Sequence, residues 1–219
     1  MAYLTQVLID SDTARQLKLW KWDSYNWHQA VWKAFPGRDG KKRDFLTRLD
    51  EHNNGFRLLI VSPIEPTRPD WCPPDAWQTK PIPETYFGKS RYAFQLCANP
   101  TKKVTKLNAD RSPTKNGKRV PLRQREELVA WIERKGEQGG FKVDKDKLRT
   151  VPRGPERFQK NGARGLHTSV EFAGMLTVTD PQKFHEAFPR GIGPAKAFGY
   201  GLLVIAPIIE KSNKEGEAK

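Results

Sequence analysis

Apolar and polar residues alternate along the first half of the chain in a way that predicts short strands around one helix. The helix is expected over residues 24–35, which read SYNWHQAVWKAF. Its apolar positions fall three and four residues apart, as an amphipathic helix requires: Trp27, Ala30, Val31, Ala34 and Phe35. Strands are predicted at 3–9, 45–49 and 56–61, the last two joined by EHNNG, in which Asn54-Gly55 is a hairpin-turn signal. A proline-rich stretch, residues 62–85, follows and can hold only a short helical turn near Pro74–Trp77.

The second half of the chain gives a similar order of elements. A strand over 92–98 precedes a helix over 122–135. A strand over 168–178 is expected to pair, through the turn KNGARG, with a strand that ends before Lys160. Asp180 and Pro181 are typical of a helix start, and this helix should end near Phe188 before a last strand over 199–207.

The order strand-helix-strand-strand-helix-strand therefore occurs about twice, although no repeat is visible in the sequence itself. This order is the ferredoxin-like pattern. We expect an α+β protein with two tandem ferredoxin-like domains, residues 1–88 and 89–219, each an antiparallel sheet with helices on one face.

The distribution of charge along the chain indicates a class of binding partner. The net charge is +14, and residues 102–164 contain 19 Lys and Arg against 8 Asp and Glu, a net +11 that leaves only +3 for the rest of the chain. Such clustering favours a polyanion, because each neutralised phosphate releases counterions. A solvated basic surface without a nucleic-acid role is the alternative. No basic amphipathic helix or long apolar span predicts a membrane partner.

Few other motifs suggest chemistry. The only cysteines, Cys72 and Cys97, have no metal or redox spacing, and with no secretory signal they fit a cytoplasmic protein. The four histidines lie far apart, so no metal site is expected, and no cofactor-binding loop is found. The glycine-rich segment GIGPAKAFGYG, residues 191–201, fits either a tight turn or a phosphate-binding loop to which Lys196 adds charge.

A second face of the predicted helix at 24–35 offers the best candidate for catalysis. It aligns Tyr25, His28 and Trp32. Near the positive end of a capped helix, a histidine is disfavoured in its charged form, and a neutral imidazole is what a general base must be at pH 7. Such a base could activate the 2′-hydroxyl of RNA. A partly exposed histidine beside an apolar core is the structural alternative for a single unaligned sequence.

Several of these segments together resemble one known family. The helix with Tyr25-x-x-His28 followed by VWKAFPG, the basic segment at 98–122, VEFAGMLTVTDPQKF and the terminal GIGPAKAFGYGLLVIAPI are similar, in the same order, to the CasE group of CRISPR-associated endoribonucleases. The resemblance implies two RRM-like domains. It also implies cleavage of precursor CRISPR RNA at the base of the repeat stem-loop, without a metal or other cofactor. The product would end in a 2′,3′-cyclic phosphate or a 3′-phosphate and would be retained in the Cascade complex.

The resemblance also assigns roles to residues of this chain. His28 matches the catalytic histidine and Tyr25 its neighbour, and a basic hairpin that enters the RNA groove maps onto residues 156–165, where Lys160 would stabilise the transition state. The expected RNA contacts are Arg157, Arg164, Lys102, Lys103, Arg119, Arg123, Arg134 and Lys196. The expected partners are a CRISPR repeat stem-loop and other Cascade subunits. A non-catalytic subunit that only holds an RNA hairpin remains the alternative from another functional class.

Overall fold

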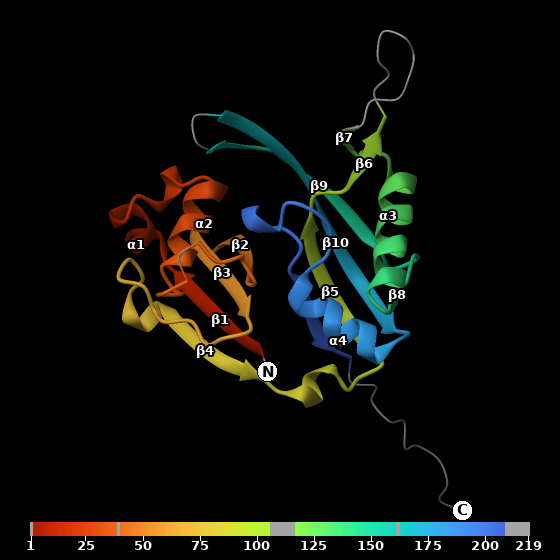
Figure 1. Cartoon of the computed structure of the whole chain (residues 1–219), viewed down its shortest axis with the longest axis horizontal. Coiled ribbons are helices and arrows are strands. Elements are labelled where there is room, and N and C mark those ends of the chain that lie inside the picture. The colour runs from red at the N-terminus through yellow and green to blue at the C-terminus, as the bar shows by residue number, and fades with distance from the viewer. Residues whose placement is uncertain (1, 39, 106–116, 161–162, 209–219) are drawn as a thin grey trace, which may run out of the picture.

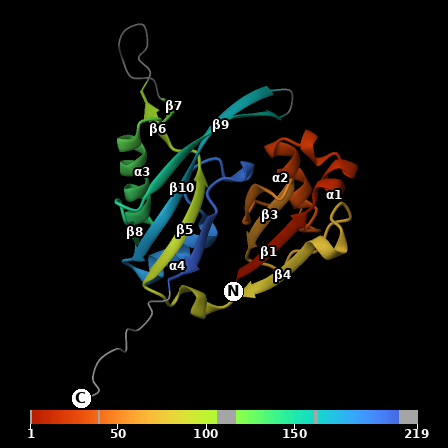
Figure 2. The same ribbon diagram turned by 180° about the vertical axis from the view of Figure 1, so that it is seen from behind.

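Two antiparallel sheets lie side by side in the computed structural model, which describes residues 2–38, 40–105, 117–160 and 163–208 (Figures 1 and 2). The first sheet has the strand order β2-β3-β1-β4. Its strands are β1 (Ala2–Ile9), β2 (Leu46–His52), β3 (Gly55–Ser62) and β4 (Trp77–Ile82). Between β3 and β4, where a ferredoxin-like domain usually has its second helix, the proline-rich chain forms only the short 3-10 turn η2 (Pro74–Ala76).

One face of the first sheet is covered by α1 (Ser11–Gln16), the 3-10 turn η1 (Leu19–Lys21) and α2 (Ser24–Trp32). Asp23 starts α2, because its Oδ1 accepts hydrogen bonds from the backbone N–H groups of Tyr25 and Asn26 at 3.0 and 2.9 Å. The Asn26 side chain accepts in turn from the N–H of Asp23, which completes a capping box. All five residues of the predicted apolar stripe are buried, but the helix ends at Trp32 rather than at 35, so Ala34 and Phe35 pack from the turn that follows it.

The first sheet is buried on both faces. In β3, Phe56, Leu58 and Ile60 pack toward α2, whereas Leu59 and Val61 pack into the core of the second domain. Successive side chains of a strand point to opposite faces, so a strand covered on both sides needs a continuous apolar run. This placement accounts for the continuous apolar run LLIV at residues 58–61 of the strand.

The turn between β2 and β3 lies one residue earlier than predicted. Asn53 and Asn54 occupy the left-handed region, with φ of +47° and +60°, while His52 pairs with Gly55. The predicted Asn54-Gly55 turn is therefore wrong. Gly55 belongs to the strand, where a Cβ atom would lie 1.9 Å from the backbone oxygen of Ile9.

The second sheet has the order β11-β5-β10-β8, and β9 also pairs with β10. Its strands are β5 (Arg91–Ala98), β8 (Phe141–Val143), β9 (Arg149–Lys160), β10 (Ala163–Val178) and β11 (Leu203–Pro207). The helices α3 (Arg125–Gln138) and α4 (Pro181–Arg190) cover one face, with Trp131, Ile132, Phe184 and Phe188 in the core. The strand order in both sheets confirms the expected α+β fold of two tandem ferredoxin-like domains.

Three details of the second domain differ from the sequence-based expectation. Helix α3 begins at Arg125 rather than 122, because the N–H of Leu122 donates to the Pro100 oxygen and its side chain enters the core. Strand β11 begins at Leu203 rather than 199, because Gly199 and Gly201 have φ of +83° and +87°. The hairpin of β6 (Thr101–Val104) and β7 (Lys118–Pro121) was not predicted. No helix in the described part of the chain has the length and hydropathy needed to cross a membrane.

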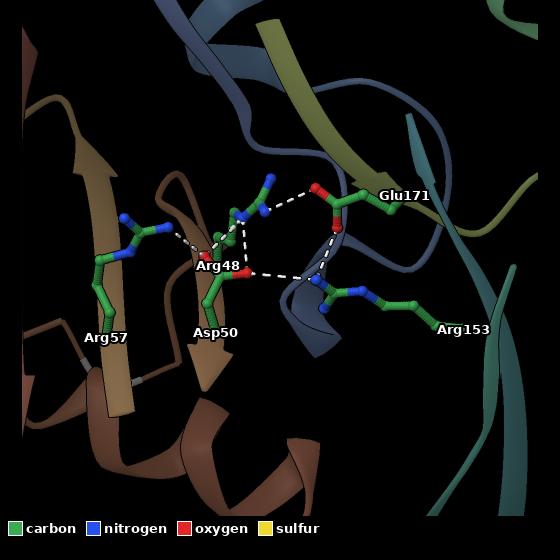
Figure 3. A network of polar contacts seen from close by, with 5 residues as sticks. All are labelled: Arg48, Asp50, Arg57, Arg153 and Glu171. Atoms are coloured by element: carbon green, nitrogen blue, oxygen red, sulfur yellow. Dashed lines mark hydrogen bonds and ion pairs between the residues drawn. The ribbon is translucent and has the colours of Figure 1, made fainter. Parts of the chain in front are cut away.

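A buried network of arginines and carboxylates joins the two domains (Figure 3). Arg48 of β2, only 3% exposed, binds Asp50 of the same strand at 2.9 Å and Glu171 of β10 at 2.8 Å. Arg153 of β9 reaches the same two carboxylates, Glu171 at 2.7 Å and Asp50 at 3.5 Å. Each carboxylate is thus shared by arginines from both domains, and Arg57 adds a further contact to Asp50 at 3.0 Å.

The two acids of this network balance the charge of Arg48, which is almost fully buried. Burial alone raises the pKa of Asp50, but hydrogen bonds and charges from Arg48 and Arg57 outweigh it and hold the pKa below its ordinary value of 3.8. The carboxylate form therefore stabilises the folded protein at neutral pH. This contribution is present above the unfolded pKa and is lost as the pH falls through the lower, folded one.

We predict that Glu171→Gln lowers the free energy of unfolding by about 3–5 kcal/mol, because it leaves the buried Arg48 without its partner in the second domain. Urea denaturation at pH 7 measures this change. Asp12→Asn is the matched control: its ion pair with Arg15 is equally short, 3.0 Å, but exposed, so its loss should change stability by less than about 1 kcal/mol. Equal effects of the two substitutions would contradict the role of the network.

For the unaltered protein we predict a loss of stability on acidification, centred below pH 3.8, as Asp50 takes up a proton and releases Arg48 and Arg57. Unfolding free energies measured between pH 6 and pH 2 in unaltered protein and Asp50→Asn check this, since the variant should already lack that acid-dependent contribution. Parallel profiles of the two proteins would contradict the assignment.

Candidate active site

A cavity of about 680 Å³ lies between the two domains. Helix α2 and strands β2 and β3 line it from the first domain. Strands β5, β9 and β10 and residues 198–200 line it from the second. On the second sheet these are the side chains that point away from α3 and α4, such as Gln95, Cys97 and Ser169. The polar face of the second sheet therefore forms one wall.

His28 borders this cavity from the first turns of α2, where it is half-buried. Its Nε2 atom lies 3.1 Å from the indole Nε1 of Trp32, one turn further along the helix. An indole N–H can only donate, so Nε2 is the acceptor. In this arrangement Nε2 carries no proton of its own. Phe45 packs against both rings, with centroids 6.0 Å from His28 and 5.0 Å from Trp32.

Tyr25 lies one turn before His28 and is also half-buried. Helical spacing places the two residues on the same side of α2, as the sequence predicted. Only His28, however, is among the residues that line the cavity. Tyr25 stands beside the cavity rather than in its wall.

The described residues of the cavity wall carry no net positive charge. Arginines 48, 57 and 153 face four carboxylates, Asp50, Glu51, Glu156 and Glu171. The interior would thus not attract a polyanion by its own charge. Positive charge beside His28 would then come from the rim of the cavity.

The long hairpin of β9 and β10 supplies one part of this rim. It extends past the second sheet toward the first domain, and α2 lies against β9 (Figures 1 and 2). The pairing predicted through KNGARG is confirmed on both sides of the turn: Lys160 is opposite Ala163, Gln159 opposite Arg164 and Arg157 opposite Leu166. Arg157 is exposed. The side chains of Lys160 and Arg164 lie outside the described part of the structure.

An aromatic cluster that the sequence analysis missed supports the base of this hairpin. The His167 ring stacks on Phe158, with centroids 4.6 Å apart and planes 13° from parallel, and also contacts Phe198 at 4.6 Å. Asn99 lies 3.0 Å from His167 Nδ1, and Tyr200 donates a hydrogen bond to Glu156. Burial lowers the pKa of His167, which keeps its ring neutral within the cluster.

The alternation of residues along the two hairpin strands is the signal that could have revealed this cluster. Glu156 and Phe158 lie two residues apart on β9 and therefore face the same side of the hairpin. In the strand register Glu156 is opposite His167. The cluster also explains Gly165, whose Cβ position would lie 2.1 Å from the Phe158 ring.

The remaining candidate RNA contacts fall into two groups. Lys102 and Lys103 on β6 and Arg123 before α3 are exposed and line neither this cavity nor its neighbour, and Lys102 forms an ion pair with Glu127 at 2.7 Å. Arg119, Arg134 and Lys196 instead come together around a second cavity of about 490 Å³. Within the described ranges no group of three or more His, Cys, Asp or Glu side chains is placed to hold a metal ion.

Known proteins resemble this chain along nearly its whole length. A family model described as "CRISPR associated protein" matches residues 2–207. The Cascade subunit CasE of Escherichia coli K12 is 32% identical over 211 residues, which cover 94% of this chain and all of that protein. The CRISPR-associated endoribonuclease Cse3 of Thermus thermophilus is 33% identical over 205 residues, 84% of this chain and 90% of that one.

Solved structures give the same result. A structure of the endoribonuclease Cse3 bound to a 19-nucleotide RNA matches with a TM-score of 0.72 and 28% identity, over 94% of this chain and all of that chain. Cas6e from Escherichia coli K-12 matches with a TM-score of 0.70, again at 28% identity and over 94% of this chain and all of that one. With two ferredoxin-like domains and matches along nearly its whole length, this chain belongs to the family of CRISPR-associated proteins that includes CasE and Cse3.

Proposed function

We propose that this protein is an endoribonuclease that cleaves precursor CRISPR RNA at the base of the repeat stem-loop and keeps the product as a subunit of Cascade. The observation that carries the proposal is His28, whose Nε2 atom accepts a hydrogen bond and which is held on the capped helix α2 at the border of a cavity between two RRM-like domains. Similarity to CasE, a Cascade subunit, and to Cse3, which has been solved with an RNA that represents a pre-cleavage complex, supports it.

In the proposed reaction the RNA supplies its own nucleophile. His28 removes the proton of a 2′-hydroxyl, whose oxygen then forms a bond to the adjacent phosphorus while the bond from phosphorus to the 5′-oxygen breaks. The products are a 2′,3′-cyclic phosphate and a 5′-hydroxyl, and the leaving oxygen takes up one proton. No metal ion is required for these steps, and DNA, which lacks the hydroxyl, is not a substrate.

His28 can act as a base only after the hydrogen bond that its Nε2 atom accepts from Trp32 has been replaced. Nε2 already accepts a hydrogen bond from Trp32, so the ribose hydroxyl takes the place of the indole as the donor. One hydrogen bond is exchanged for another, which keeps the change in free energy small. Tyr25, one turn away, orients the phosphate or passes a proton to the leaving oxygen, and Lys160 stabilises the charge that develops on the phosphate.

Binding of the stem is assigned to the basic surface of the second domain. Arg157 and Arg164 of the hairpin contact the groove of the RNA, and Lys102, Lys103 and Arg123 contact phosphates of the stem. Because the described wall of the cavity carries more carboxylates than arginines, these rim residues provide the attraction for RNA.

We predict that His28→Ala slows cleavage of repeat RNA by about 10²–10⁴-fold, the usual loss for a general base, with little change in RNA affinity. Single-turnover assays in EDTA, with analysis of the product ends for a cyclic phosphate, measure this. His185→Ala is the control, since this histidine lies on α4 beside Glu84 and should leave the rate unchanged. Equal rates for the His28 variant and the unaltered protein would contradict the role of His28, and a requirement for added metal would contradict the mechanism.

Charge reversal in the hairpin gives a second prediction. Arg157→Glu, Lys160→Glu and Arg164→Glu together should weaken RNA binding and reduce its dependence on salt, by about 0.9 in the logarithmic slope for each duplex phosphate that the protein no longer neutralises. Fluorescence anisotropy at several salt concentrations measures both quantities. Affinity equal to that of the unaltered protein would show that the hairpin does not contact the stem.

A non-catalytic RNA-holding subunit is the second candidate function. It is favoured by the carboxylate-rich cavity wall and by the engagement of His28 Nε2 with Trp32 in the structure. The same EDTA assay distinguishes the two, because a holding protein in excess would leave the repeat RNA intact after long incubation.

A further inference from the structure

Trp20, in the 3-10 turn η1, is the one tryptophan that the fold leaves exposed. All seven tryptophans lie in the described part of the chain, and Trp20 is 52% exposed whereas the others are buried or half-buried. Its ring packs on Phe56 of β3, with centroids 4.4 Å apart. The Phe56 ring contacts in turn Trp27, the residue before His28, at 5.5 Å. An indole that the core supports and that stays half exposed can stack a second flat ring.

A pocket of about 560 Å³ opens beside this indole, and we call it the tryptophan pocket. It lies between α1, η1 and the turn that joins β2 to β3. Apart from Trp20, its described wall is polar: Ser11, Arg15, Glu51, His52, Asn53 and Asn54. An apolar protein surface would leave these groups without hydrogen-bond partners, whereas a nucleobase has an apolar face for the indole and polar edges for the rim.

The polar rim offers both donors and acceptors to such an edge. Arg15 only donates and Glu51 only accepts, while the amides of Asn53 and Asn54 do both. The ion pair of Arg15 with Asp12 is exposed, so it can be exchanged at little cost. Bases carry donors and acceptors in different orders along their edges, so this mixture suits a base without selecting one.

Charge gives the pocket little attraction for phosphate. The cations nearby in the sequence, Arg15, Lys18 and Lys21, are exposed. Three carboxylates of the same region balance them: Asp10, Asp12 and Glu51. A ligand would therefore be held here through its ring rather than through its backbone.

The tryptophan pocket adjoins the cavity of His28. Glu51 lines both, and Phe56, which supports Trp20, also lines the cavity. The pocket belongs to the first domain, whose α1 lies on the side far from the second domain (Figures 1 and 2). If the second domain holds the stem and the cut is made at His28, the strand that continues beyond the cut runs over the first domain, where this pocket opens.

We propose that Trp20 and the tryptophan pocket bind an unpaired base of the RNA, on the side of the cut that is away from the stem. The identity of the strand as substrate RNA rests on the proposed function. The ligand chemistry, a flat heteroaromatic ring with polar edges, rests on the pocket alone. This base would leave with the released fragment, so the site binds the uncut RNA and makes no contact with the retained stem.

Trp20→Ala tests the proposal with three labelled RNAs built on one repeat stem-loop, each with a 2′-deoxy nucleotide at the cut so that it stays intact. The first ends at the cut, the second continues as a short single-stranded tail, and the third has the same tail without bases. The unaltered protein should bind the tail with bases at least about fivefold more tightly than the abasic tail, the lower value for one stacked base. Trp20→Ala should abolish this preference and leave the affinity for the tail-less RNA unchanged.

Two further variants serve as controls. Trp20→Phe keeps an aromatic ring and should retain most of the preference. Ile64→Ala removes an apolar side chain that is 43% exposed but lines none of the three cavities, so its preference should equal that of the unaltered protein. Because no phosphate contact is lost, the logarithmic salt slope should be the same for Trp20→Ala and the unaltered protein. Circular dichroism verifies folding.

Absence of the preference in the unaltered protein, or an unchanged preference in Trp20→Ala, would overturn the proposal. Equal weakening of all three RNAs would also overturn it, because Trp20 would then act through the fold. A change of oligomeric state in Trp20→Ala, seen by size-exclusion chromatography with the preference intact, would assign the indole to a second copy of the chain. If an all-ribose RNA stays uncut in EDTA while the preference is present, the proposed activity fails and the base-binding site stands.

Discussion

The shared carboxylates between the domains are the contact on which the arrangement of the site depends. His28 is carried by the first domain, whereas the hairpin and the glycine-rich loop belong to the second. Asp50 and Glu171 fix the distance between these parts, because each binds arginines from both sides of the junction. The second face of the first sheet, through Leu59 and Val61, joins the same core and adds an apolar contact that is insensitive to pH.

The site therefore has two kinds of surface, one that gives rigidity and one that carries positive charge. The wall of the central cavity is polar, nearly balanced in charge and tightly bonded, so it serves for rigidity more than for attraction. Outside it, exposed arginines that form no ion pair with a carboxylate among the described residues include Arg157 on the hairpin and Arg119 and Arg134 around the second cavity. Positive charge concentrated away from the reacting groups would attract RNA without placing salt-sensitive contacts at the point of reaction.

Much of the fold could be predicted from the sequence because local signals and burial agree. The stripe of α2, the Asp180-Pro181 start of α4 and the hairpin around KNGARG all depend on neighbouring residues. The predictions fail where contacts with residues far away in the sequence determine the local conformation. The local pattern places Gly55 in a turn, although it faces Ile9. It places Leu122 in a helix, although its backbone N–H donates to the Pro100 oxygen. The same difference between local and distant contacts decides which parts of the site could be predicted. His28 and the hairpin could be found by pattern, whereas the network around Arg48 and the His167 cluster consist of residues far apart in the chain. The catalytic roles of His28, Tyr25 and Lys160 remain predictions.

The hydrogen bond between Trp32 and His28 has a consequence for the order of events in a catalytic cycle. An indole has a hydrogen to give and no lone pair to offer in its plane. Once the imidazole has taken a proton on Nε2, the two N–H groups would oppose each other, and the resting contact cannot form again. In the proposed reaction, the contact between Trp32 and His28 can therefore form again only after that proton has passed to the leaving oxygen or to water, so this hydrogen bond marks the regenerated base.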